Sequence, residues 1–135
     1  MKKELDEALC KEYPKIFKDR HEDMKKTLMC WGFACDDGWY PLIDTLCALL
    51  MWDGSGKPVE NPPVAIQVKE KFGGLRFYVG GATDQQHNFI MFAEVLSFKI
   101  CETCGTMADV FQTKGWIRTT CQKCEDIRTS KDKEK

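Results

Sequence analysis

The sequence lacks a long apolar run, an excess of one charge and a set of histidines. Its longest apolar stretch, residues 46–52, is far too short to cross a bilayer. The net charge is −1, from 20 basic and 21 acidic residues, so no global charge draws the chain to nucleic acid. The 2 histidines lie outside any HExxH motif, and no glycine-rich segment matches a phosphate loop. These absences count against membrane, zinc-protease and nucleotide-binding proteins.

The composition is that of an ordinary globular protein, with 43% hydrophobic and 30% charged residues in 135. The first residues, MKKELDEALCKEY, are charged and amphipathic, so we do not expect them to be a secretory leader. We therefore expect a cytoplasmic protein that makes no membrane contact. In that reducing compartment its 8 cysteines are expected to be metal ligands or buried thiols.

Apolar residues at helical spacing predict helices over residues 2–12 and 39–52, and a short helix over 16–24. Asp36 and Asp37 are expected to cap the second of these. The proline- and glycine-rich segment 54–63 is expected to be a loop. The buried face of the helix over 39–52 is predicted to contain Trp39, Leu42, Ile43, Leu46, Cys47, Leu49 and Leu50.

Alternating apolar residues predict a β-hairpin over residues 64–80, with positive φ angles at Gly73 and Gly74 in its turn. Thr83 and Gln86 form a capping-box pattern that begins a helix ending near residue 100. The apolar stripe of that helix is expected to contain Phe89, Phe92, Ala93, Leu96 and Ile100.

The most specific pattern is CETC, then sixteen residues that begin with glycine, then CQKC. Two CxxC pairs at this spacing are typical of one tetrahedral zinc ion, here held by Cys101, Cys104, Cys121 and Cys124. Four cysteine ligands leave no coordination position for water, so the zinc is expected to be structural. A single thioredoxin-like redox pair is disfavoured because no βαβ context surrounds either motif.

Between the pairs we expect a hairpin of residues 107–111 and 116–119, and the second pair is expected to open a short helix. This order resembles a treble-clef finger, with a zinc ribbon as the alternative. The predicted architecture is therefore α+β: an α+β domain over residues 1–98, followed by a zinc-finger module over 99–130.

The stretch MCWGFACDDGWYP contains Cys30 and Cys35, which could supply two ligands to a second metal. The remaining cysteines, Cys10 and Cys47, do not complete a motif with them, and Cys47 lies on an apolar helix face. We therefore interpret Cys35 as a buried thiol, and we expect Trp31, Phe33 and Trp39 to pack in the core.

The stretch KEKFGGLRFY mixes basic and aromatic residues, as surfaces that contact phosphates and stack on bases do. Alternating aromatics on a strand are more often core residues. The candidate nucleic-acid contacts are Lys69, Lys71 and Arg76, with Arg118 from the zinc module.

Three segments together resemble a set of small proteins of tailed phages and prophages of Gram-negative bacteria. They are MCWGFACDDGWYPLIDTLC, QVKEKFGGLRFYVGGATD and the terminal CETCG…GWIRTTCQKC, and the similarity spans roughly residues 25–125. In that set the WGF motif is followed by Cys, Gly or Asp, Asp, Gly and Trp. Residues 35–39 fit this pattern, and Cys30 is optional in it. The resemblance implies a phage accessory protein acting in the host cytoplasm, and it supplies no catalytic residues.

The function expected from these observations is binding, not catalysis, because no base, nucleophile or open metal position can be named. The leading hypothesis is a zinc-binding phage protein that binds and modulates or inhibits a host protein, with host defence components as candidates. Its contact surface is expected to include Asp36, Asp37 and Trp39. The alternative is a nucleic-acid-binding regulator that uses the zinc module and the basic hairpin. The sequence leaves the oligomeric state open.

Overall fold

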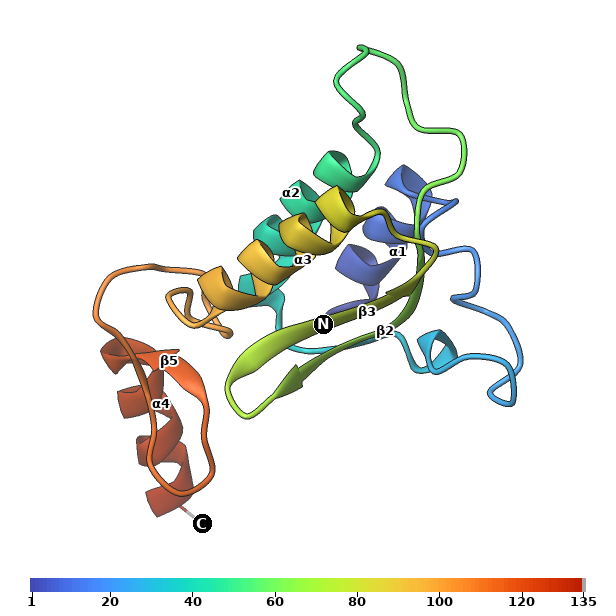
Figure 1. Cartoon of the computed structure of the whole chain (residues 1–135). Helices are drawn as coiled ribbons and strands as arrows, with labels where there is room; N and C mark the ends of the chain where they lie inside the picture. Colours follow the sequence, from blue (N-terminus) through green and yellow to red (C-terminus); the bar gives the residue numbers. More distant parts are fainter. Residues whose placement is uncertain (135) are drawn as a thin grey trace.

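The computed structural model describes residues 1–134 and confirms a mixed α+β fold (Figure 1). Within these residues, no helix is both long and apolar enough to cross a membrane. The elements, in chain order, are α1 (Lys3–Glu12), the 3-10 turn η1 (Met29–Trp31), β1 (Phe33–Ala34), the 3-10 turn η2 (Asp37–Trp39), α2 (Tyr40–Leu50), β2 (Val64–Lys71), β3 (Gly74–Gly80), α3 (Asp84–Ser97), β4 (Val110–Gln112), β5 (Thr119–Cys121) and α4 (Gln122–Lys133).

The larger sheet has the order β1-β2-β3, with β1 parallel to β2 and β3 antiparallel to it. Opposed pairs alternate between the two faces of the hairpin. Val68 and Phe77 form a buried pair, and the next pair, Lys69 and Arg76, lies on the opposite face. Helices α2 and α3 run side by side over the hairpin (Figure 1). The sheet therefore has one face in the core and one face at the surface.

The core lies between the buried sheet face and the helices. Phe17 packs edge-on against Phe33 and Phe77, with ring centroids 5.0 and 6.3 Å apart respectively. Trp39 is fully buried, and its indole N–H donates to the Ile100 carbonyl at 2.9 Å. The predicted apolar face of α2 is confirmed for Leu42, Ile43, Leu46, Cys47 and Leu50, all of which are buried.

The segment between α1 and β1 does not contain the helix predicted over residues 16–24. It forms successive turns, with hydrogen bonds between residues close in sequence, such as Phe17 N–H to Tyr13 O at 3.1 Å. Ile16 and Phe17 are buried nonetheless, and the Ile16 carbonyl accepts from Ala65 N–H at 2.8 Å. Contacts with the sheet, rather than helix formation, place this segment.

The prediction that Trp31 packs in the core was wrong. Its side chain is 69% exposed, whereas its neighbours Met29 and Phe33 are buried. Gly32 follows it with φ of 75°, in the left-handed region that favours glycine. A side chain there would also meet the Asp6–Arg20 ion pair. The chain thus turns at Gly32, and Trp31 is left at the surface.

The β2–β3 turn differs by one residue from the prediction. Its two positive-φ residues are Phe72, at 53°, and Gly73, at 84°. Gly74 belongs to β3, and it is needed for a different reason. A Cβ atom at Gly74 would lie 2.4 Å from Cζ of Phe98. Gly74 is therefore needed because it leaves space for the Phe98 ring, and not because the turn requires a positive φ there.

Helix α3 begins with the predicted capping box. Thr83 Oγ1 accepts from Gln86 N–H at 3.2 Å, and Gln86 Oε1 accepts from Thr83 N–H at 2.8 Å. The predicted apolar stripe was wrong at Phe92, which is 68% exposed. The buried positions of α3 are instead Gln86, Ile90, Ala93 and Ser97.

Two polar side chains of α3 have a role at the edge of the sheet. Ser97 Oγ accepts from Leu75 N–H at 2.9 Å, and Glu94 Oε2 accepts from Phe77 N–H at 2.9 Å. These are N–H groups of β3 that have no partner strand on that side. Side chains of α3 thus satisfy the open edge of β3, which would otherwise leave backbone donors unpaired.

We expect Gly74→Ala to lower the free energy of unfolding by about 1–3 kcal/mol, because its new methyl group would overlap the Phe98 ring. Gly80→Ala in the same strand is the matched control. Its Cβ would meet only Ile66 Cδ1, at 3.7 Å, so little change is expected. Urea denaturation of both variants measures the difference, and equal midpoints would contradict the close approach of Phe98.

Candidate metal centre

The predicted ligands Cys101, Cys104, Cys121 and Cys124 converge at one point. Their sulfur atoms all lie within 4.8 Å of one another, and those of Cys104 and Cys121 are 3.8 Å apart. A tetrahedron with Zn–S bonds of about 2.3 Å has sulfur-to-sulfur edges of about 3.8 Å. The four-cysteine site therefore suits one structural metal ion such as zinc.

The first ligand pair lies in a tight backbone knuckle. Gly105 N–H donates to the Cys101 carbonyl at 2.8 Å, and Cys101 N–H donates to the Thr106 carbonyl at 2.8 Å. Gly105 has φ of 82°, in the left-handed region that favours glycine. A Cβ at Gly105 would also lie 3.0 Å from the Gly38 carbonyl oxygen.

The second pair is at the start of α4, in the order of knuckle, β4–β5 hairpin and helix that is typical of a treble-clef finger. Cys121 is the N-cap of α4, and its sulfur accepts from Cys124 N–H at 3.4 Å. Backbone donors at a helix N-terminus favour the thiolate, which is the form that binds metal.

The pKa values within the cluster differ. Burial raises the pKa of Cys101, but backbone N–H groups of Cys104, Cys121 and Thr103 outweigh burial and lower it to about 6. Burial and the neighbouring sulfurs raise the pKa of Cys124. Because a metal ion binds thiolates, its binding to the cluster must release the protons that the cysteines hold.

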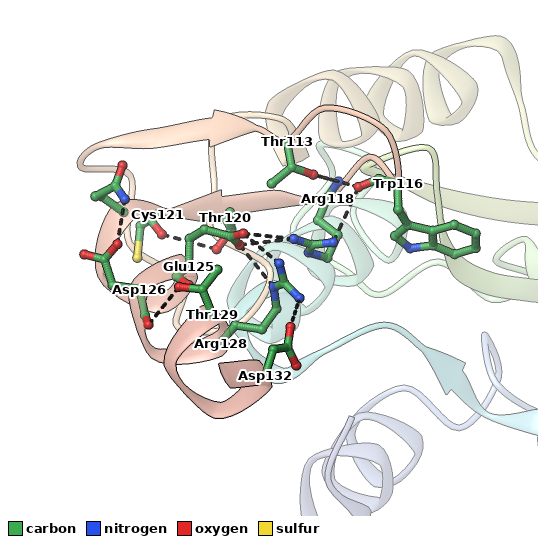
Figure 2. A network of polar contacts seen from close by, with 11 residues as sticks. Thr113, Trp116, Arg118, Thr120, Cys121, Glu125, Asp126, Arg128, Thr129 and Asp132 are labelled. Carbon is green, nitrogen blue, oxygen red and sulfur yellow. Dashed lines mark hydrogen bonds and ion pairs between the residues drawn. The ribbon is translucent and has the colours of Figure 1, made fainter. Parts of the chain in front are cut away.

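An ion-pair network joins the hairpin to α4 (Figure 2). Glu125 accepts from Arg118 at 3.1 Å and from Arg128 at 2.8 Å, and Arg128 also pairs with Asp132 at 2.8 Å. The bonds from Arg128, followed by those from Arg118, lower the pKa of Glu125 despite its burial. Arg118 was predicted to contact nucleic acid, but its guanidinium is engaged within the module.

The first knuckle rests on the segment that precedes α2. Gly38 N–H donates to the Glu102 carbonyl at 2.7 Å, and the Glu102 carboxylate accepts from Asp36 N–H at 2.9 Å. A Cβ at Gly38 would lie 2.3 Å from the Cys101 carbonyl oxygen. The boundary proposed at residue 98 stays a prediction, and contacts across it are close.

The contact surface predicted for Asp36, Asp37 and Trp39, in the stretch MCWGFACDDGWYP, is not present as expected. Trp39 is fully buried and cannot contact a partner. Asp36 and Asp37 make no side-chain cap on η2; Asp37 instead accepts from Lys2 N–H at 2.7 Å. The main role of this stretch is to contact the first ligand knuckle of the metal cluster, and Asp36 is exposed at the edge of that contact.

The other cysteines form no second metal cluster in the part of the chain that the structure describes. Cys35 and Cys47 are buried, and burial raises the pKa of both thiols, in Cys35 to about 12. Cys10 and Cys30 are half-buried beside Arg20. The interpretation of Cys35 and Cys47 as buried thiols is thus confirmed.

The basic hairpin residues lie together on the surface face of the sheet. Lys69 and Arg76 are directly opposed across β2 and β3, and Lys71 is opposed to Gly74 two residue pairs nearer the turn. Lys71 Nζ lies 5.7 Å from the centre of the Phe72 ring. None of these three cations joins an ion pair with any residue from 1 to 134.

Sequence reasoning missed two apolar surfaces. One is the outer face of α3, where Met91, Phe92 and Val95 are 58, 68 and 62% exposed. The other is formed by Phe72 and Trp116, at the tips of the two hairpins, which are 69 and 80% exposed. The sequence did contain a signal for the second surface. The β2–β3 turn has Phe72-Gly73 at the two positions where Asn-Gly is usual.

Comparison with family models, with curated proteins and with solved structures finds no match to this chain.

Metal analysis of the purified protein is expected to find about one zinc per chain. Cys121→Ser should lose most of this zinc and much of the thermal stability, because it removes one metal ligand while serine can still cap α4. Cys30→Ser, which lies outside the cluster, should keep the full zinc content. Two zinc ions per chain, or equal loss in both variants, would contradict this assignment.

Proposed function

We propose that the protein is a phage accessory protein, held together by zinc, that binds a host protein and modulates or inhibits it without catalysing a reaction. Host defence components are the candidate partners. The single observation that supports this proposal most is the outer face of α3. Met91, Phe92 and Val95 lie within one and a quarter turns of the helix, opposite its buried positions, and all are more than half exposed.

The outer face of α3 is also poor in charge. Asp84 and Glu94 are the only formally charged residues of the helix, and the Glu94 carboxylate is turned to Phe77 N–H at 2.9 Å. A charged partner would lose hydration here without gaining a counter-charge. The proposed partner therefore presents an apolar groove or patch, and burial of the three side chains supplies most of the binding free energy.

We expect the tagged protein to retain one stoichiometric partner from host lysate, and Phe92→Ser to weaken its retention at least tenfold. Burying such a side chain contributes about 1.5–3 kcal/mol. Trp31→Ser is the matched control, because Trp31 is 69% exposed and Phe92 68%. The recovered partner, purified, is then titrated by calorimetry against all three proteins. Equal affinities would contradict the proposal, as would a stable homodimer that occupies the α3 face.

Nucleic-acid binding is a second candidate function, and a specific observation favours it. Like charges directly opposed in a sheet are destabilising, yet Lys69 and Arg76 occupy such a pair at the surface. Glu70, which lies between Lys69 and Lys71 in the sequence, accepts from Gly73 N–H at 2.7 Å and forms no ion pair with either lysine or with Arg76. Phosphates would relieve this repulsion.

If this second function is correct, oligonucleotide binding should weaken steeply with added salt. Lys69→Ala and Arg76→Ala should each reduce the slope of log K against log salt by roughly 0.7–0.9 per lost phosphate contact. Lys25→Ala, an exposed lysine in the turns before β1, is the control and should leave the slope unchanged. Lack of binding at low salt would rule this candidate out.

A further inference from the structure

The tips of the two hairpins are fixed to each other. The Thr119 hydroxyl, on β5, donates to the Gly73 carbonyl in the β2–β3 turn. Gly73 allows this approach, because a Cβ there would lie 2.9 Å from Cγ2 of Ile117. Gly73 N–H is held in turn by Glu70. The side chains at the two tips therefore have a set position relative to each other.

Between the tips is a hollow of about 400 Å³, lined by Glu70, Lys71, Phe72, Gly115, Trp116 and Ile117. This volume is within the range of about 300–1,000 Å³ that is typical of small-ligand sites. Trp116 projects away from the ion-pair network of the zinc module (Figure 2). Its indole is 80% exposed, so it contributes little to the core.

Phe72 occupies its position at an energetic cost. With φ of 53° it is in the left-handed region, where a bulky residue is strained and asparagine or glycine is preferred. Its ring is 69% exposed, so packing does not offset that strain. Strained residues of this kind cluster at ligand sites. The ring at this turn is therefore better explained by an occupant of the hollow than by stability.

The chemistry of the lining indicates the occupant. Phe72 and Trp116 provide flat aromatic surfaces, and Lys71 adds a cation beside them. Lys69 and Arg76 continue the positive charge along the open sheet face. The carboxylate of Glu70, the acid of the lining, is directed at Gly73 N–H. A flat ring attached to a chain of phosphates matches all of these features.

We propose that a single-stranded nucleic acid binds here, with one base stacked against Phe72 and Trp116 in the hollow. Its phosphates follow Lys71, Lys69 and Arg76 along the sheet. The proposal rests on the second candidate function, and it adds the strandedness and the position of the base. A duplex is excluded from this site because its bases are stacked on one another and cannot enter.

The test uses fluorescence anisotropy with four probes of about 12 nucleotides: oligothymidine, oligouridine, an abasic strand of the same charge, and a duplex. The better of the two pyrimidine strands is expected to bind about 5- to 100-fold more tightly than the abasic strand, as loss of stacking predicts. It should also bind more tightly than the duplex, and its sugar identifies the polymer as DNA or RNA.

Two variants separate a role in binding from a role in folding. Phe72→Asn should keep or raise the thermal midpoint, because asparagine suits the turn, while it weakens binding of the pyrimidine strand at least fivefold. Trp116→Ala should weaken it similarly. Trp52→Ala, which removes a half-exposed tryptophan two residues after the C-terminal end of α2, should not weaken binding. Neither tip variant should change binding of the abasic strand.

The outcomes distinguish the two levels of the proposal. If the abasic strand binds as tightly as the pyrimidine strand, or if both tip variants bind normally, the proposed base site is wrong. Nucleic-acid binding to the basic sheet face is then still supported. Tighter binding of the duplex would likewise overturn the base site alone. If no probe binds at low salt, nucleic-acid binding itself fails.

Discussion

The close approach of the metal knuckle to the N-terminal side of α2 is the constraint on which the rest of the structure depends. Gly38 allows it, because the Cys101 carbonyl oxygen would lie 2.3 Å from any Cβ at that position. Hydrogen bonds between residues 36–39 and residues 100–102 then connect the zinc module to the core helix. With the metal module held in this way, the β4–β5 hairpin lies against the β2–β3 turn, where the Thr119 hydroxyl donates to the Gly73 carbonyl.

Local chemistry explains which features could be predicted from the sequence. The Thr83–Gln86 capping box, the buried face of α2 and the spacing of the four zinc ligands each depend on residues close together in the chain. Such patterns act through hydrogen-bond reach, helical period and tetrahedral geometry, which do not require knowledge of the tertiary fold. The four-cysteine site was predicted in full for this reason.

The features that were missed depend on contacts distant in sequence. Phe92 fits the helical stripe, but Ser97 and Glu94 take the inner face because β3 has backbone donors to satisfy. Gly74 resembles a turn residue, but the Phe98 ring dictates its size. Trp39 was assigned to both the core and a contact surface. The structure places it in the core, where its indole N–H donates to the carbonyl of Ile100, a residue distant in sequence. No local pattern contains this information.

The hydrogen bond from Thr119 to Gly73 has a thermodynamic consequence. Thr119 is two residues before the ligand Cys121. The short segment from 119 to 121 therefore both contacts the turn of the main sheet and supplies a ligand to the metal cluster. Any occupant that binds only the assembled pair of hairpins must raise the affinity for the metal, and the metal must raise the affinity for that occupant by the same factor. The supply of zinc in the cell would then set not only how much of the protein is folded, but also how strongly it holds what it has bound.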